Sequence, residues 1–391
     1  VFGHIYTGGI GTILTAWFNE LKVSEEIQGL CIGCGKCKEV CPGRIDIPGL
    51  ILELRRRMAR KQGLPFIQKN ALRIINNRKV FHAMLRAAYL GQKPFAREGL
   101  IRHLPMFLSH LSEYRSLPAI APVPFRDLFK KIHQPRCETK AAFFAGCAID
   151  FVFPETGVAV VQLLNKAGIE VVFPEDQSCC GIPHWSSGAF DMAALAAAHN
   201  LGPLMEQDVD YVVTACATCA TALKKEWPRL LRTEGMESLV PLAETVASRT
   251  LMFSELAARL IGEGRLTPKE GQLLRSVTYH DSCHAKRHVG ISEEPRAALA
   301  AAGCALREMV ECDTCCGMGG SYTVKQPELS MSMLKRKLDN AEATGAEFVC
   351  AECPGCLIQI GGGLDKRGSR MKARHLAELI NDSFEGRPEN E

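Results

Sequence analysis

The sequence predicts an α/β protein in which two repeated units with parallel βαβ sheets follow a small α-helical module. Three observations support this fold class. One pattern of cysteines occurs twice, strands and helices are predicted to alternate around each copy, and a separate run of closely spaced cysteines lies near the start of the chain. Strands that alternate with helices are typical of parallel sheets. Each copy of the pattern is therefore expected to form one structural unit.

The repeated pattern is a single cysteine, then Cys-Cys-Gly, then Cys-x2-Cys. In both copies 31 residues separate the single cysteine from the adjacent pair, and 35 or 36 residues separate this pair from the last two cysteines. We call the two groups the first and second cysteine sets. The first set comprises Cys147, Cys179, Cys180, Cys216 and Cys219, and the second set comprises Cys283, Cys315, Cys316, Cys353 and Cys356. Clustered thiols of this kind are typical ligands of soft metals.

Each copy is predicted to place its cysteines directly after strands. In the first copy we expect strands at 141–145, 169–173 and 211–214, with helices at 155–167 and 189–207. In the second copy we expect strands at 277–280, 306–310 and 348–350, with helices at 293–302 and 327–343. Ligands of parallel sheets bind beyond the carboxyl ends of the strands, so three loops at one sheet edge can bring five thiolates together. The glycine runs at 8–11 and 361–363 fit no nucleotide-binding motif and are assigned to turns.

The run Cys31-x2-Cys34-x2-Cys37-x3-Cys41-Pro42 has the spacing of bacterial ferredoxins and predicts a [4Fe–4S] cubane. In ferredoxins with two clusters, the fourth cysteine of such a run binds the other cluster. The chain starts at Val1 rather than at a methionine. We therefore expect this module to be truncated at its N-terminus and a second run to have preceded it.

Shifts in composition divide the chain into six segments. Residues 1–50 are the ferredoxin-like module, 51–115 a helical segment, 116–140 a proline-rich linker, 141–245 the first repeated unit, 246–275 a connecting helix and 276–385 the second repeated unit. The helical segment carries a basic run at Arg55, Arg56, Arg57, Arg60 and Lys61. This run is either a solvated helix face or a positive surface beside anionic clusters or an acidic redox partner.

The two cysteine sets admit three kinds of chemistry. Adjacent cysteines rarely form a disulfide with each other, but as thiolates they can bind or bridge two metal atoms. Iron–sulfur clusters are favoured, and the alternatives are a structural zinc in each set or a dithiol that exchanges disulfides. The other cysteines are expected to be small buried apolar residues: Cys137, Cys304, Cys312 and Cys350. For Cys312 and Cys350, which lie close to the second set in the sequence, a ligand or redox role is the alternative.

Three histidines lie near the sets. His280 and His284 flank Cys283, and His184 follows Cys180. Each is either hydrogen bonded to a cluster or an ordinary core or surface histidine. No Ser/His/Asp arrangement or carboxylate pair indicates a hydrolytic site.

The composition excludes several classes of protein. Apolar residues make up 47% and charged residues 23% of the chain, as in an ordinary globular protein. A net charge of +4 predicts no strong affinity for nucleic acid. No stretch approaches the roughly 18–20 apolar residues that span a bilayer, so we expect no integral membrane protein, while peripheral docking on a membrane redox partner stays open. Clustered cysteines without a signal peptide favour metal thiolates in a reducing cytoplasm.

The cysteine pattern and its neighbours resemble the cysteine-rich "CCG" domain proteins, whose signature both copies match. This family includes the cysteine-rich subunits of heterodisulfide reductase and of anaerobic glycerol-3-phosphate dehydrogenase, and the iron–sulfur proteins of glycolate oxidation and lactate utilisation. Residues 2–57, with Gly3-His-Ile-Tyr6 before the ferredoxin run, resemble a dicluster ferredoxin-like lactate-utilisation protein. Finer details favour the lactate and glycolate members, namely Phe144-Ala-Gly-Cys147, Tyr279-His-Asp-Ser-Cys-His284, Thr314-Cys-Cys-Gly-Met-Gly-Gly-Ser321 and Pro354-Gly-Cys-Leu357.

The resemblance implies an iron–sulfur electron-transfer subunit of a lactate- or glycolate-type 2-hydroxyacid dehydrogenase complex. A flavoprotein subunit would oxidise the substrate, and further iron–sulfur subunits would complete the complex. The resemblance also implies a non-cubane [4Fe–4S] cluster in one or both cysteine sets, with zinc as the alternative. A cytoplasmic subunit of this kind can dock at the inner face of the membrane. Two other functions stay open: a heterodisulfide-reductase-like subunit that reduces a disulfide at a CCG cluster, and a zinc-stabilised assembly scaffold.

Overall fold

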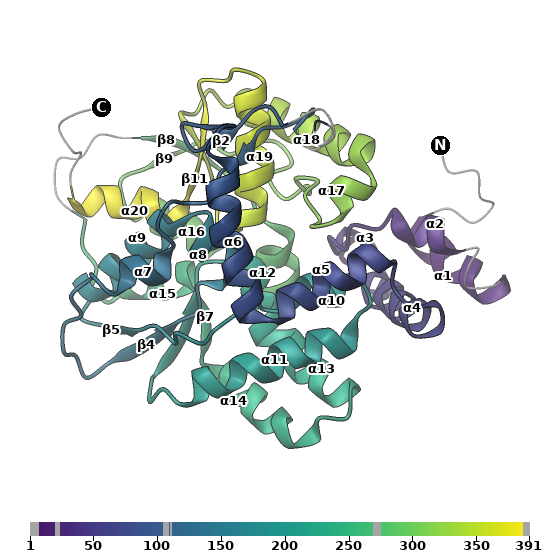
Figure 1. Ribbon diagram of the computed structural model, residues 1–391. Helices are drawn as coiled ribbons and strands as arrows, with labels where there is room; N and C mark the ends of the chain where they lie inside the picture. The colour runs from purple at the N-terminus through teal and green to yellow at the C-terminus, as the bar shows by residue number, and fades with distance from the viewer. Residues whose placement is uncertain (1–7, 20–23, 105–108, 110–111, 269–274, 386–391) are drawn as a thin grey trace.

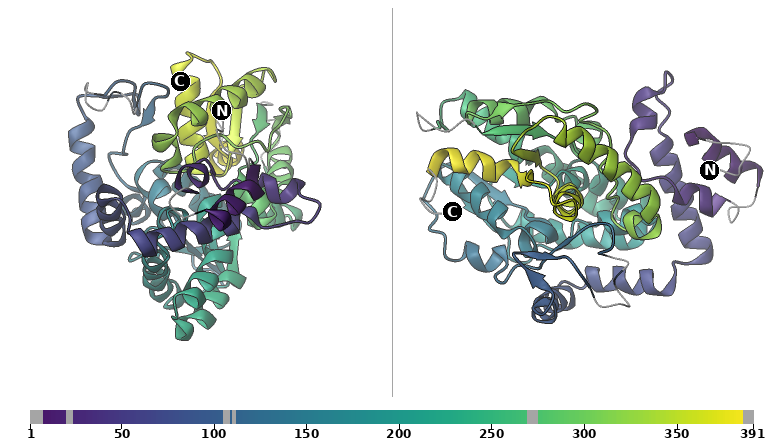
Figure 2. Two further views of the ribbon diagram at one scale, coloured as in Figure 1. Left: turned by 90° about the vertical axis from the view of Figure 1, so that its right-hand side faces the viewer. Right: turned by 90° about the horizontal axis from the view of Figure 1, so that it is seen from above.

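The computed structural model describes residues 8–19, 24–104, 109, 112–268 and 275–385. Two α/β units form the body of the molecule, and the N-terminal helices lie at one side of it (Figure 1). Seen from above, these helices and α20 (Leu376–Glu385) lie at opposite ends of the molecule (Figure 2). The stretch at residues 3–6 that contributed to the resemblance lies outside the described residues, as does Val1.

Short helices surround the ferredoxin run. The longest of them is α4 (Ile47–Gln62). The side chain of Asp46 accepts a hydrogen bond from the Gly49 N–H and so caps the N-terminus of this helix, and Gly63, with φ of 76°, ends it. The buried side chains of this helix include Ile51 and Met58, which lie two turns apart on one face. The helices are α1 (Gly8–Phe18), α2 (Ser24–Gly29), α3 (Lys36–Val40) and α4 (Ile47–Gln62).

Two further helices and a small antiparallel sheet connect this module to the α/β body. They are α5 (Phe66–Asn76), α6 (Arg78–Gln92), β1 (Ala96–Arg97), β2 (Leu100–Ile101) and β3 (Leu117–Pro118), followed by α7 (Phe125–Phe129). Phe125 is fully buried, with its ring centroid 5.3 Å from the centroids of both Phe143 and Phe173. The proline-rich segment predicted as an extended linker is thus packed onto the first unit, because Phe125 finds an apolar site there.

The first unit is a four-stranded parallel sheet with the order β5-β4-β6-β7. The segment 246–275, predicted as a connecting helix, contributes its fourth strand, which is too short to show a period in the sequence. The strands are β4 (Lys140–Phe143), β5 (Glu170–Val172), β6 (Tyr211–Thr214) and β7 (Thr250–Met252). The helices are α8 (Gly146–Phe151), α9 (Pro154–Lys166), α10 (Ile182–Ser186), α11 (Phe190–Met205), α12 (Ala217–Thr221), η2 (Ala222–Glu226), α13 (Trp227–Thr233), η3 (Glu237–Leu239), α14 (Val240–Arg249) and α15 (Phe253–Gly262).

The second unit repeats this topology strand for strand. Its parallel sheet has the order β11-β10-β8-β9, so that β8 and β10 correspond to β4 and β6. The predicted fold class is therefore confirmed. The strands are β8 (Ser276–Tyr279), β9 (Ala305–Leu306), β10 (Phe348–Ala351) and β11 (Lys372–His375). The helices besides α20 are η4 (His284–Val289), α16 (Glu293–Ala301), α17 (Tyr322–Lys325), α18 (Pro327–Glu342) and α19 (Pro354–Lys366).

Both glycine runs that were assigned to turns lie in helices, α1 and α19, so this prediction was wrong. In α19 the glycines allow close packing. A Cβ on Gly362 would collide with the carbonyl oxygen of Ser116, and one on Gly363 would lie 2.8 Å from the side chain of Leu338. A run of glycines suggests a turn when only local propensity is considered, and tertiary packing overrides that propensity here.

The two units share one apolar core and meet at the carboxyl ends of their strands. His375 donates from Nε2 to the carbonyl oxygen of Ala215 at 2.8 Å, and the Ala217 N–H donates to the carbonyl oxygen of Glu352 at 3.0 Å. Ala215 follows β6 and Glu352 follows β10. The edges that carry the cysteines therefore face each other. Among the described helices, none has the length and apolar character needed to cross a membrane.

Candidate metal centres

All ten cysteines of the two sets lie beyond the carboxyl ends of strands, as predicted, and all are free thiols. Cys147 lies in the first turn of α8, and Cys283 directly precedes η4, at its N-cap position. Cys216 and Cys353 occupy the same position before α12 and α19. The N-terminus of a helix carries partial positive charge, which favours the thiolate form of a nearby cysteine.

The structure brings the five thiols of the first set together. Along the set, in the order Cys147, Cys179, Cys180, Cys219 and Cys216, each thiol lies within hydrogen-bonding reach of the next. The hydrogen bonds from Cys179 and Cys219 lower the pKa of the Cys180 thiol to about 6. The set thus contains a thiol that ionises readily although four of its members are buried.

The second set has the same arrangement, in the order Cys283, Cys315, Cys316, Cys356 and Cys353. The Sγ atoms of Cys316 and Cys356 are 3.3 Å apart. Hydrogen bonds from Cys283 and Cys316 hold the pKa of Cys315 well below its usual range, and one from Cys356 lowers the pKa of Cys353 to about 6. Compact groups of soft, ionisable thiols fit an iron–sulfur cluster or another soft metal.

The glycine of each Cys-Cys-Gly triplet is required for two reasons. Gly181 and Gly317 have φ of 89° and 88°, in the left-handed region that disfavours other residues. Each also lies against the helix that follows. A Cβ on Gly181 would be 3.2 Å from the carbonyl oxygen of Ala193 in α11, and one on Gly317 would collide with that of Ser330 in α18. The triplet can therefore turn its two thiols toward the other cysteines without losing contact with the helix.

The ferredoxin run forms the loop between α2 and α4, with Cys37 on the short helix α3. Burial raises the pKa of Cys34 and of Cys37, and the nearby Cys31 raises both further. Cys41 ends α3. The loop turns at Gly33 and Gly35, whose φ values are 76° and 78°.

This loop is seated on the second cysteine set. His288 in η4 contacts the carbonyl oxygen of Gly33 through Nε2 at 3.3 Å. Asp313, two residues before Cys315, pairs with Lys36 at 3.2 Å. A Cβ on Gly319, after the triplet, would collide with the side chain of Ile32.

Charges reinforce this contact. Arg287 bridges the two parts, with Nε 2.8 Å from Glu39 and Nη2 2.7 Å from Asp313. Burial alone would raise the pKa of Asp313, but its hydrogen bond to Lys36 and the charges of Arg287 and Lys286 lower this pKa to about 2. The thiols of Cys34 and Cys315 lie close enough for Cys315 to raise the pKa of Cys34. The ferredoxin run is therefore the direct neighbour of the second set.

The second set in turn borders the first. Thr218 lies between Cys216 and Cys219, and its Oγ1 is 3.5 Å from Sγ of Cys353. The hydroxyl of Thr221 donates to the carbonyl oxygen of His284 at 3.4 Å. The three groups of cysteines thus form a continuous row: ferredoxin run, second set, first set.

Two buried cations lie beside the second set. Lys337 is 1% exposed and donates from Nζ to the carbonyl oxygens of Glu311 and Cys312, at 2.6 and 3.1 Å. Arg115 donates to Gln359 and lies 3.2 Å from the sulfur of Met318. Within the described part of the chain neither cation is paired with a carboxylate, and each interacts electrostatically with the thiol of Cys316. Such cations compensate negative charge, which suits an anionic cluster.

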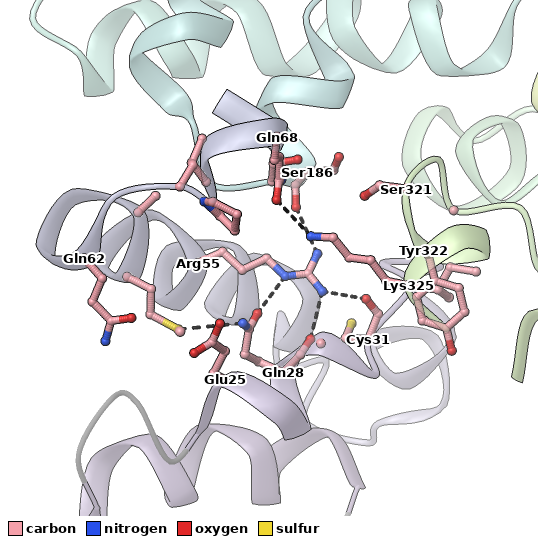
Figure 3. A pocket seen from close by; sticks show the side chains of 18 of the residues that line it. Glu25, Gln28, Cys31, Arg55, Gln62, Gln68, Ser186, Ser321, Tyr322 and Lys325 are labelled. Carbon is pink, nitrogen blue, oxygen red and sulfur yellow. Dashed lines mark hydrogen bonds between the residues drawn. The ribbon is translucent and has the colours of Figure 1, made fainter. Parts of the chain in front are cut away.

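The basic run on α4 holds the N-terminal module in place. Arg55 donates to the side-chain and backbone oxygens of Gln28 at 2.8 Å each and to the carbonyl oxygens of Cys31 and Ser186 at 2.7 and 3.0 Å (Figure 3). A cleft of about 160 Å³ opens beside it, with Lys325 donating to Gln68 across the cleft.

The neighbouring arginines of this run anchor α4 to the first unit. Arg56 and Arg60 pair with Glu234 at 3.1 and 2.9 Å. Arg57, in contrast, is 63% exposed and pairs within its own helix. The run is thus divided: Arg55, Arg56 and Arg60 contact other parts of the protein, whereas Arg57, Arg60 and Lys61 are exposed to solvent.

The three histidines differ in their surroundings. His184 contacts the carbonyl oxygen of Leu72 through Nε2 at 2.9 Å and so connects α10 to α5. His284 lies 3.8 Å from Sγ of Cys283 and stacks on His288. His280 is fully buried, and one of its ring nitrogens lies within 4.8 Å of the sulfurs of Cys316 and Cys356. Sequence reasoning missed Thr218, Arg115 and Lys337; only Thr218, as an interior residue of Cys-x2-Cys, carried a local signal.

Four cysteines lie outside the sets and the ferredoxin run. Cys304 and Cys350 are buried, as expected, whereas Cys137 and Cys312 are half-buried. The Cys312 carbonyl accepts a contact from His280 and one from Lys337. Its backbone therefore supports the second set.

The repeated α/β unit with its thiols at the sheet edge defines a class, the cysteine-rich (CCG) domain. The model of that domain family matches residues 141–224 and 277–361, one match for each unit. The probable glycolate oxidase iron-sulfur subunit of Bacillus subtilis is 31% identical over 379 residues, which cover 91% of this chain and 82% of that protein. Lactate utilization protein A 2 of Bacillus cereus is 33% identical over 244 residues, which cover 62% of this chain and 97% of that protein.

The chain belongs to the CCG-domain family of iron–sulfur proteins, and the predicted resemblance is confirmed. A crystal structure of a hypothetical protein from Helicobacter pylori superposes with a TM-score of 0.56 at 10% identity and covers 98% of this chain and 68% of that one. At this identity the likeness concerns the fold alone.

Proposed function

We propose that this chain is the iron–sulfur electron-transfer subunit of a complex that oxidises lactate, glycolate or a similar 2-hydroxyacid. The names of its relatives, a glycolate oxidase iron-sulfur subunit and lactate utilization proteins, support this assignment. The observation that carries it is the continuous row of three thiol groups, in which the ferredoxin loop lies on the second set and the second set contacts the first.

Cys31, Cys34, Cys37 and Cys41 would hold a [4Fe–4S] cubane, and each five-cysteine set would hold a non-cubane [4Fe–4S] cluster, with zinc as the alternative in either set. Bound clusters supply storage and transfer of single electrons. The chain's own residues supply the ligands, the glycine turns that let the backbone approach, and the cations Arg115 and Lys337 that offset negative charge beside the second set. Because the row has two ends, electrons would enter at one end and leave at the other.

A flavoprotein subunit is the expected electron donor, because oxidation of a 2-hydroxyacid removes two electrons and an iron–sulfur cluster accepts one at a time. Further iron–sulfur subunits are expected in the complex. Free thiols and metal thiolates persist in a reducing compartment, so we place the protein in the cytoplasm, with peripheral docking at the inner face of the membrane as the way to reach a membrane acceptor.

The proposal can be tested on protein purified without oxygen together with its co-purifying subunits. Iron and acid-labile sulfide near three cluster equivalents are expected, and L-lactate or glycolate should produce EPR signals of reduced clusters only when the flavoprotein is present. Cys34→Ala should remove the ferredoxin signal, and Cys137→Ala, a cysteine outside every group, should leave all signals unchanged.

Two results would contradict the proposal. Zinc without iron in all three groups would support an assembly scaffold instead. Turnover of a disulfide by this chain alone, without a flavoprotein, would support a disulfide reductase of the heterodisulfide type.

A further inference from the structure

The two cysteine sets are not chemically equivalent, although they share their five thiols. The residue three positions before the first cysteine is Phe144 in the first unit and His280 in the second. Phe144 is fully buried and packs edge-on against Trp227, with 5.9 Å between the ring centroids. His280 occupies the matching place in the second unit and is buried as completely.

The hydrogen bonds of His280 define which ring nitrogen is available. Nδ1 lies 3.1 Å from the carbonyl oxygen of Cys312. A carbonyl oxygen can only accept, so Nδ1 carries the proton. With the proton of the neutral ring on Nδ1, Nε2 is the nitrogen that presents a lone pair. A backbone carbonyl that fixes the tautomer in this way is typical of histidines that bind metals through the other nitrogen.

Nε2 has no partner in the described structure, although it is buried. A polar atom left unsatisfied inside a protein costs about 1–3 kcal/mol, so its retention calls for an explanation. One of the two ring nitrogens lies within 4.8 Å of the sulfurs of Cys316 and Cys356. Since Nδ1 is engaged by the Cys312 carbonyl and metal-bound thiolates have no proton to donate, a metal atom held by these cysteines is a partner that would satisfy Nε2.

We infer that Nε2 of His280 is a ligand to a metal atom held by the second cysteine set, so that the second centre is a mixed cysteine–histidine site and the first an all-cysteine site. This inference rests on the proposed metal-binding role of the second set. It gives the two centres different ligands on the same scaffold. Imidazole is a good ligand for both iron and zinc.

The test uses the full chain labelled with ¹⁵N-histidine and purified without oxygen. Pulsed EPR of the reduced protein should show the strong ¹⁵N coupling of an imidazole bound to iron. His280→Phe, which installs the residue type of the first unit, should lose this coupling, and His184→Gln, which alters a buried histidine of the first unit, should retain it. Loss of the coupling in His184→Gln instead, or its absence from the wild-type protein with iron in the second set, would overturn the inference.

X-ray absorption on the wild-type protein covers the case in which the second set holds zinc, and it needs no variant to fold. One nitrogen at about 2.0–2.1 Å beside sulfur at about 2.3 Å at the zinc edge would support the histidine ligand. Because zinc does not change its oxidation state, this result would also remove the second set from the proposed electron path. The histidine ligand and the electron-transfer function can therefore fail separately. A zinc site with sulfur neighbours only would overturn the role of His280.

Discussion

The hydroxyl of Thr218, which lies between Cys216 and Cys219 of the first cysteine set, is 3.5 Å from Sγ of Cys353, which belongs to the second set. Like the hydrogen bond from Cys356, this contact lowers the pKa of the Cys353 thiol. When Cys353 is a thiolate, the hydroxyl of Thr218 is the partner that can donate. Hydrogen bonds to cluster sulfurs raise reduction potentials, because they stabilise the extra negative charge of the reduced state. A single side chain beside the first set thus affects a thiol of the second.

Thr218→Val keeps the shape of the side chain and removes the donor. We expect a lower midpoint potential for the second-set centre alone, measured by potentiometric titration with EPR detection. The control Thr245→Val alters a half-buried threonine whose hydroxyl donates within α14, and it should change no potential. A shift confined to the ferredoxin cluster would contradict the row of contacts described above.

Lys337→Met should also lower the potential of the second-set centre. Lys337 is buried and its charge acts on the thiols of Cys316 and Cys356. Reduction adds negative charge, which a nearby cation stabilises, so its removal favours the oxidised state. Lys335→Met, on the exposed side of the same helix, is the matched control. Equal titration curves for the two variants would show that Lys337 serves packing only.

Gly317→Ala should destabilise the second unit and release its metal. A left-handed backbone costs a non-glycine residue about 1–2 kcal/mol, and the collision with Ser330 adds about 1–3 kcal/mol of overpacking. Gly303 has a similar φ of 78° but open space around it. Gly303→Ala should therefore lower the free energy of unfolding only by the cost of the left-handed backbone, about 1–2 kcal/mol. Denaturant unfolding and metal content measure both effects, and equal losses would disprove the steric argument.

Arg55→Met should loosen the N-terminal module. Four oxygen acceptors on three residues lose their donor, and we expect a loss of about 2–4 kcal/mol in the free energy of unfolding. Arg57→Met removes an exposed i,i+4 pair on the same helix and should cost less than about 0.5 kcal/mol. If both variants resist proteolysis between α4 and α5 as the wild type does, Arg55 does not anchor the module.

The attachment of α6 should weaken in acid. Burial, together with the charges of Arg126, Arg78 and Arg86, lowers the pKa of His82 to about 3. In the unfolded chain a histidine has a pKa near 6.5, so the unfolded state binds the proton more readily than the folded state does. The contribution of His82 to the stability of the folded state is therefore complete above about pH 6.5 and is lost as the pH falls toward 3.

Hydrogen exchange of α6 between pH 7.5 and 5 measures this effect after correction for the intrinsic rate. His82 packs on Phe151 with 4.9 Å between ring centroids. His82→Phe keeps an aromatic ring at this position and should remove the pH dependence. The same slope in both proteins would assign it to another group.

The cysteine pattern was predictable because the spacing of cysteines can be read directly from the sequence. The sets at Cys147–Cys219 and Cys283–Cys356, and the strands before them, follow from the gaps and from the alternation of apolar segments. The glycines of α19 and the strand β7 were not predictable in this way. Gly362 is explained only by its approach to Ser116, which is 246 residues away in the sequence, and a three-residue strand has no measurable period.

The sequence by itself determined how the cysteines are grouped and in what kind of fold they lie, since the repeated cysteine pattern and the alternating strands and helices can be read along the chain. Only the tertiary structure decided the order of the three groups and the difference between the two sets. The ferredoxin run precedes the first set in the sequence, but its loop lies on the second, because Lys36 and Glu39 pair with Asp313 and Arg287. Likewise, the role inferred for His280 depends on two results of packing and not of spacing: its buried Nε2 has no partner among the described residues, and its ring lies beside the thiols of Cys316 and Cys356.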